Sequence, residues 1–202
     1  MDKLLKALYV AGTIGQIVIR APIERQRRHI RMTDERVDRM ERVSLGVLFL
    51  WGFLIPMAYV FTPWLNRANY RWSPETKARA GGLGALLMAG ALWLFWRSHA
   101  DLGHNWSPSL QIGAEHTLVT RGVYRYIRHP MYASQWVWII AQLLLLQNWI
   151  AGSSGLLSFP LLYLGRVSRE EQMMLDHFGD TYRAYMGRTG RVLPRLRQTH
   201  AD

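Results

Sequence analysis

The chain has 202 residues, half of them hydrophobic, with nine Trp, nine Tyr and no Cys. This length suits a single domain, and the lack of cysteine excludes disulfides and thiolate metal sites. A formal net charge of +11 would suggest nucleic acid in a soluble protein, but here the Arg residues alternate with acids in segments that separate strongly apolar ones. This distribution favours a membrane protein whose loops meet anionic lipid headgroups, and it argues against nucleic-acid binding.

The N-terminal half contains two apolar runs. Leu4–Ile19 is apolar or small except for Lys6 and Gln16. A signal peptide is the competing interpretation, but no small-x-small cleavage site follows the run. Val43–Thr62 carries no charge and is long enough to cross a bilayer core of about 30 Å, with a buried core helix as the alternative. Pro56 should kink this helix, which membrane helices tolerate.

A third charge-free run, Ala80–Trp96, is rich in small residues. Gly82, Ala85, Ala89 and Gly90 would let a neighbouring helix approach closely. This run therefore predicts a membrane helix that packs tightly against another.

The C-terminal half predicts a helical hairpin. Ser134–Ala151 is charge-free, a Gly-Ser-Ser-Gly turn signal follows at 152–155, and a short apolar stretch with Pro160 then leads into a charged helix. With the three earlier runs, the hairpin predicts an all-α, polytopic integral membrane protein of about five transmembrane helices.

Orientation follows from the number of spans. With five, segments 20–42, 97–133 and 166–202 share one side and hold most of the Lys and Arg, which predicts that this side is cytoplasmic. We expect residues 1–98 to form N-terminal membrane helices with a basic cytosolic loop, and residues 99–202 to form the functional core.

Two polar segments flank the hairpin and should meet at its cytoplasmic end. The first contains RGVYRYIRHPMYAS at 121–134, and such a Tyr and Arg cluster beside a bilayer is usually an interfacial anchor. In the second, Arg166 and Glu170 share one helix face at the membrane border, where an ordinary solvated salt-bridge helix is the alternative. No His pair has metal-ligand spacing, so no metal site is predicted.

Two blocks in these segments resemble the signature of a known family. GAEHTLVTRGVYRYIRHPMYAS at 113–134 and REEQMMLDHFGDTYRAYMGRTGRVLP at 169–194 are similar to the isoprenylcysteine carboxyl methyltransferase (ICMT) family and the related membrane phospholipid methyltransferases. The resemblance covers roughly residues 99–194. It implies an integral membrane methyltransferase that uses S-adenosylmethionine, with a cytosolic pocket formed by the loop before the hairpin and the helix after it.

The resemblance also implies roles for individual residues. Arg166 would meet the substrate, and Glu171 is a second catalytic candidate that would help deprotonate an amine acceptor. Ten residues besides the less securely aligned Gln111 would bind the cofactor: His116, Thr117, Leu118, Val119, Tyr124, His129, Pro130, Met131, Tyr132 and Glu170. Tyr rings can stabilise the sulfonium cation, and Glu170 can accept hydrogen bonds from the ribose or the amine.

The expected acceptor is a hydrophobic, lipid-like or isoprenoid molecule that enters from the bilayer and is methylated on a carboxylate or an amine. The expected location is a bacterial inner membrane, with membrane lipids around the helices and the cofactor site facing the cytoplasm. A membrane reductase with a nicotinamide cofactor on a related scaffold is one alternative. A non-catalytic scaffold that binds anionic lipid is the other.

Overall fold

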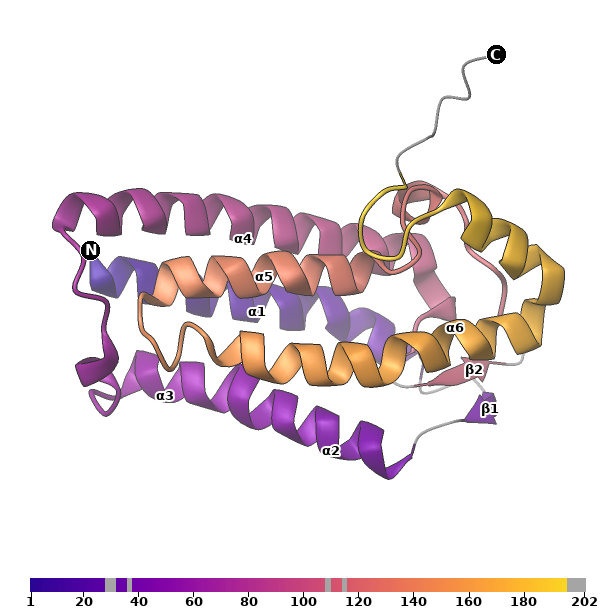
Figure 1. Ribbon diagram of the computed structural model, residues 1–202, viewed down its shortest axis with the longest axis horizontal. Coiled ribbons are helices and arrows are strands. Elements are labelled where there is room, and N and C mark those ends of the chain that lie inside the picture. The colour runs from indigo at the N-terminus through magenta and orange to yellow at the C-terminus, as the bar shows by residue number, and fades with distance from the viewer. Residues whose placement is uncertain (28–31, 36–37, 108–109, 114–115, 196–202) are drawn as a thin grey trace, which may run out of the picture.

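The protein is a bundle of long helices that lie side by side along one axis, in the computed structural model of Figure 1. The structure describes residues 1–27, 32–35, 38–107, 110–113 and 116–195. The α-helices are α1 (Asp2–Arg27), α2 (Arg39–Val47), α3 (Ile55–Phe61), α4 (Pro74–Leu102), α5 (Pro130–Leu146) and α6 (Ser154–Arg188). The all-α prediction is thus confirmed, apart from one short antiparallel pair, β1 (Met32–Glu35) with β2 (Gln111–Gly113).

Within the described part of the chain, three helical segments are long and apolar enough to cross a membrane: Asp2–Arg25, Arg39–Phe61 and Pro74–Asn105. They coincide with the three N-terminal runs that the sequence singles out, except that Thr62 lies just beyond the second segment. The helix α5 is apolar but shorter, and the apolar start of α6 lies beside it in the bundle. A total of about five spans remains a prediction for these last two helices.

The second spanning segment contains a π-helical turn, η1 (Leu48–Leu54), between α2 and α3. Pro56 follows it in the first turn of α3. Proline has no backbone N–H and crowds the carbonyl of the preceding turn, and a wider turn relieves that crowding. The proline thus directly follows a π-helix, which packs against α6.

The hairpin turn begins earlier than the predicted apolar run suggests. The helix α5 ends at Leu146, and Gln147 adopts a left-handed conformation with φ 49°. Asn148 then organises the turn: its Oδ1 accepts hydrogen bonds from the backbone N–H of Ile150 and of Ala151, at 3.0 and 2.9 Å. These polar groups end α5 inside a stretch that contains no charged residue.

The most extensive contact between described helices joins α4 and α5, and Gly84 of α4 lies in it. A Cβ there would lie 3.0 Å from Leu144 Cβ and 3.2 Å from the carbonyl oxygen of Ala141. Gly82 and Gly90, which the sequence suggested for this role, have open space at their Cβ positions. Helix periodicity explains the difference, because only one face of α4 meets α5.

At the other end of the bundle the chain folds back on itself. The helix α6 kinks at Gly179, whose φ is 53°, and its last turns approach the segment before α5 (Figure 1). The backbone N–H of His129 donates to the carbonyl of Arg191, and that of Arg128 donates to Gly190, both at 2.9 Å. The segment after α6 thus holds the start of α5 in place.

Candidate active site

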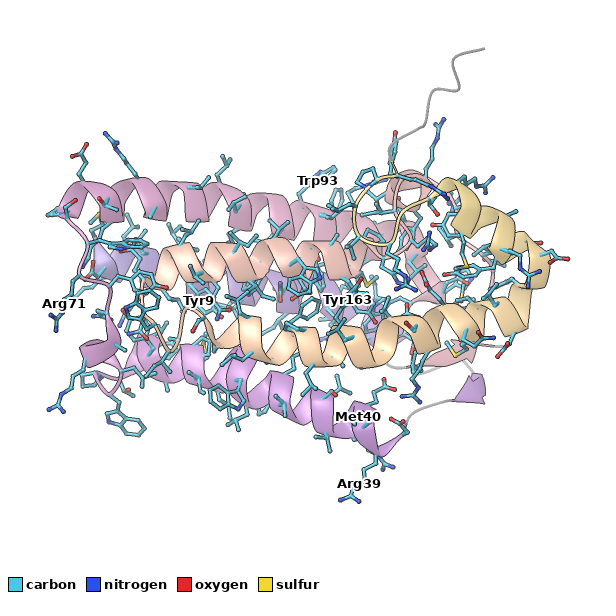
Figure 2. All side chains as sticks on the ribbon, viewed as in Figure 1. Tyr9, Arg39, Met40, Arg71, Trp93 and Tyr163 are labelled. Carbon is cyan, nitrogen blue, oxygen red and sulfur yellow. The ribbon has the colours of Figure 1, made fainter. Side chains whose placement is uncertain are left out.

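The hairpin brings its two polar flanks together, as the sequence predicts. His129 directly precedes α5, while Arg166, Glu170 and Glu171 project from the middle of α6. Aromatic rings also join the two helices. The ring centroids of Tyr163 of α6 and Tyr132 of α5 lie 5.4 Å apart, and Figure 2 labels Tyr163 between the two ribbons. This packing helps to set the position of α5 relative to α6 along the bundle axis.

His129 lies between the two glutamates. Its Nδ1 is 3.6 Å from Glu170 Oε1, and its Nε2 is 3.3 Å from Glu171 Oε1. Glu171 also pairs with Arg128 at 2.9 Å and with Arg191 at 2.6 Å. The carboxylate of Glu171 is therefore surrounded by three cationic groups when His129 is protonated.

These contacts shift the pKa values of the three acid–base groups. Burial opposes ionisation of Glu170 and Glu171, but hydrogen bonds from His129 and the neighbouring cations outweigh it and lower both pKa values to about 2. For His129, burial again opposes the charged form, and the two carboxylates outweigh it and raise the pKa above its ordinary value. Each of the three groups therefore stabilises the ionised form of its partners.

Glu170 connects this network to Arg166 and Tyr132. The Tyr132 hydroxyl donates to Glu170 Oε2 at 2.7 Å, and Arg166 Nε lies 3.6 Å from the same oxygen. The Glu170 side chain is 30% exposed, whereas that of Glu171 is only 4% exposed. Glu170 can therefore reach a ligand, while Glu171 is enclosed by its partners.

One cavity of about 650 Å³ lies against these groups. Its polar end includes Arg166 and Glu170 together with the loop before α5. Its apolar end is lined by side chains of α2, η1 and α6, among them Leu45, Leu48, Phe49, Phe53, Phe159 and Leu162. A single space thus offers charged partners at one end and hydrocarbon contacts at the other.

The structure brings nearly all of the predicted residues to this cavity. Arg166 lines it, and so do His116, Thr117, Leu118, Val119, Tyr124, His129, Pro130, Met131, Tyr132 and Glu170. Glu171 is not among the lining residues, because its carboxylate is turned toward Arg128 and Arg191. Gln111 lies in β2, and its side chain falls outside the described part of the chain.

Other lining residues were missed by sequence reasoning. Asn105 holds the loop that carries the predicted residues: its Oδ1 accepts from the Thr117 backbone N–H at 2.7 Å. Tyr185, on the last turns of α6, donates to the carbonyl of Tyr124 at 2.6 Å. Asn105 lies in the stretch Leu-Gly-His-Asn-Trp-Ser, and Tyr185 belongs to a pair of tyrosines three apart, but neither residue is among those to which the resemblance gives a role.

Comparison with known proteins places this site in context. The model of the "Isoprenylcysteine carboxyl methyltransferase (ICMT) family" matches residues 83–176. The match begins within α4, earlier than the two sequence blocks, and ends in α6 before the kink at Gly179. Every predicted site residue lies inside it.

Among the relatives, the human protein-S-isoprenylcysteine O-methyltransferase is 36% identical over 87 residues, 43% of this chain and 31% of the human protein. The corresponding Schizosaccharomyces pombe and Tribolium castaneum proteins are 31% and 32% identical, over 40% and 46% of this chain and 34% of each relative. The matched part of the chain thus spans about a third of the length of these relatives.

A solved structure of a eukaryotic intramembrane Ras methyltransferase, ICMT, has a similar fold. Its TM-score is 0.52 at 22% sequence identity, and the match covers 78% of this chain and 54% of that one. Together with the three spanning segments, this likeness makes the chain an integral membrane protein of the same helical architecture. The predicted resemblance is confirmed: over residues 83–176 the chain matches the isoprenylcysteine carboxyl methyltransferase family.

Proposed function

We propose that the protein is a membrane methyltransferase that uses S-adenosylmethionine to methylate a hydrophobic, lipid-like acceptor. The observation that carries the proposal is the single cavity in which Arg166 and Glu170, close to each other, face the same space as the apolar side chains of η1. A polar cofactor and a lipid-like acceptor need these two environments side by side. The named relatives are methyltransferases, which favours this activity over the nicotinamide-dependent reductase.

The residues at the polar end suit this cofactor. Small-molecule sites occupy roughly 300–1,000 Å³, so the volume is adequate. Glu170 is ionised and partly exposed, and it would accept hydrogen bonds from the ribose or the amino group. The rings of Tyr124 and Tyr132 would face a cation. The bound cofactor supplies a methyl group on a sulfonium, an electrophile that requires no nucleophilic side chain from the protein.

The remaining groups position the acceptor and keep the site dry. Arg166 would hold a carboxylate acceptor by paired hydrogen bonds, and the apolar wall would exclude water. Glu171, the second catalytic candidate, is proposed instead as a positioning residue, because its carboxylate is engaged by His129, Arg128 and Arg191. It would keep His129 protonated and oriented toward Glu170.

The orientation proposed from the sequence agrees with the fold. The basic residues at the end of α1 and the start of α2 lie at the same end of the bundle as the start of α5 and the second half of α6 (Figure 1). We propose that this end faces the cytoplasm, where the cofactor is made, following the positive-inside rule. A bacterial inner membrane remains the predicted location.

Calorimetric titration of detergent-purified protein with S-adenosylhomocysteine tests the cofactor. Wild type should bind, while Glu170→Ala and His129→Ala should weaken binding by about tenfold or more. Glu75→Ala is the matched control, because Glu75 is an exposed carboxylate in the first turn of α4, at the end of the bundle far from the site. Wild-type protein that releases no heat would contradict the proposal.

Methyl transfer then tests the acceptor. Labelled methyl groups should be incorporated into N-acetyl-S-farnesylcysteine if Arg166 grips a carboxylate, or into an aminolipid if the acceptor is an amine. Arg166→Lys keeps the charge but loses the planar fork, so it should lower transfer to the carboxylate more than transfer to the amine. Equal loss for both acceptors would argue against a carboxylate-binding role for Arg166.

A further inference from the structure

Glu41 is a buried carboxylate outside the region that resembles known methyltransferases. It lies in the first turn of α2, and only 3% of the residue is exposed. The helix start fixes its backbone, because Asp38 Oδ1 accepts a hydrogen bond from the Glu41 N–H at 2.8 Å. A carboxylate buried in this way is strongly unfavourable unless a cation or several donors meet it.

The cation that meets Glu41 is Arg166. Glu41 Oε1 lies 3.4 Å from Arg166 Nη1 and also accepts from the backbone N–H of Leu110 at 3.4 Å. Glu41 Oε2 has no hydrogen-bond partner among the residues that the structure describes. Arg166 Nε in turn lies 3.6 Å from Glu170 Oε2. The guanidinium is therefore held between two carboxylates on different helices.

We infer that Glu41 is a positioning residue of the site, which sets the orientation from which Arg166 meets the acceptor. The inference rests on the proposed function, because Arg166 has an acceptor to meet only there. Arg166 is a long side chain with many rotamers, and the ion pair of its Nε with Glu170 does not by itself set the direction of the outer nitrogens. A second carboxylate on Nη1 limits the rotation of the guanidinium, so Glu41 takes part in acceptor binding without lining the cavity itself.

A neighbouring ion pair allows two possible roles of Glu41 to be distinguished. Glu41 either positions the Arg166 guanidinium or simply attaches α2 to α6. Asp38 Oδ2 lies 3.0 Å from Arg169 Nη1, and this pair joins the same two helices. Its side chains are 49% and 36% exposed, and neither residue lines the cavity. If Glu41 merely fastened α2 to α6, loss of either pair would have a similar effect on the site.

The kinetic experiment compares Glu41→Gln with Asp38→Asn. Glutamine keeps the shape and the bond from Leu110 but removes the charge, and asparagine caps a helix about as well as aspartate. We expect Glu41→Gln to lower kcat/KM for N-acetyl-S-farnesylcysteine by about tenfold, chiefly through KM, with S-adenosylhomocysteine affinity unchanged. Asp38→Asn should leave both quantities at the wild-type level.

A second measurement needs no turnover. In protein labelled with ¹⁵N-arginine, the Arg166 Nε–H signal is assigned by its loss in Arg166→Lys, and its hydrogen exchange reports how firmly the guanidinium is held. Glu41→Gln should speed this exchange by about tenfold, and Asp38→Asn should not. Where Glu41→Gln does not fold, Glu41→Asp keeps the charge but withdraws it by one methylene, and it should give an intermediate rate.

Cofactor binding and the Arg166 exchange rate distinguish failure of the proposed function from failure of the positioning role of Glu41. Wild-type protein that fails to bind S-adenosylhomocysteine removes the proposed function, while the exchange rate still decides whether Glu41 holds Arg166. Equal exchange rates and equal KM values in Glu41→Gln and Asp38→Asn would overturn the positioning role.

Discussion

The two ends of the cavity are stabilised in different ways. At the polar end, His129, Glu170, Glu171 and Arg128 are joined by directional ion pairs and hydrogen bonds of 2.9–3.6 Å. At the apolar end, contacts carry no direction: the rings of Phe49 and Phe53, for instance, stack with centroids 5.5 Å apart. The first arrangement accepts one geometry, whereas the second tolerates any hydrocarbon that fits.

The two ends should therefore respond differently to substitution. A protein loses much stability when one partner is removed from a buried ionic network, because the remaining partners stay buried and charged. Apolar walls lose stability gradually, roughly in proportion to the area removed. We therefore expect substitutions at the polar end to affect folding and cofactor binding strongly, and substitutions at the apolar end to affect acceptor choice mildly.

The largest effect should come from Glu171→Gln. It removes the carboxylate that Arg128 and His129 share, in a site where their side chains are 8% and 5% exposed. The free energy of unfolding should fall by about 3 kcal/mol, measured by denaturant unfolding in detergent. Asp180→Asn is the control, because its pair with Arg183 is exposed and should change stability by less than about 0.5 kcal/mol. Equal losses in the two variants would contradict the buried network.

Acid should weaken the same network. The pKa of Glu171 falls from 4.5 to about 2 in the folded protein, so its stabilising contribution is complete above pH 4.5 and is lost as pH drops toward 2. Wild-type stability should decline over that range, by about 2–3 kcal/mol for this group, and Glu171→Gln should decline less. Because the pKa of His129 is raised, its own contribution is complete below pH 6.5 and is lost at higher pH, as pH passes its folded pKa. A wild-type stability profile that is flat between pH 4.5 and 2 would contradict the lowered pKa.

A smaller effect is expected from Tyr132→Phe. It removes one hydrogen bond to the Glu170 carboxylate, so Glu170 is less well oriented and S-adenosylhomocysteine affinity should fall by about threefold to tenfold. Calorimetry provides the measurement, and Tyr126→Phe is the control, because Tyr126 is 61% exposed and does not line the cavity. Unchanged affinity would mean that Tyr132 does not orient Glu170.

The smallest effect is expected at the apolar wall. Phe53→Ala should leave S-adenosylhomocysteine affinity unchanged and raise KM for a farnesylated acceptor by about threefold, since part of one apolar contact is lost. Phe61→Ala, farther along the same segment and 72% exposed, is the matched control. A large loss of cofactor affinity in Phe53→Ala would show that the two ends of the cavity are not separable.

Local sequence was sufficient to predict the helices, whereas most residues of the polar end were implied by the family resemblance. Apolar runs with few or no charges mark α1, α4 and the segment from α2 to α3, because an unpaired charge in hydrocarbon is strongly unfavourable. The Arg-His-Pro step and the Arg166–Glu170 spacing mark the start of α5 and one face of α6. Turn geometry was less visible, since the turn that ends α5 depends on Gln147 and Asn148 rather than on the glycines after them.

Only the tertiary structure decided which neighbours these residues meet. Glu170 and Glu171 are adjacent in sequence and chemically alike, yet one lines the cavity and the other is enclosed by Arg128 and Arg191, because successive helix positions point about 100° apart. Likewise, nothing local to Glu41 predicts Arg166 as its partner. Sequence spacing determines which residues share a helix face, whereas contacts between distant segments depend on how whole helices pack.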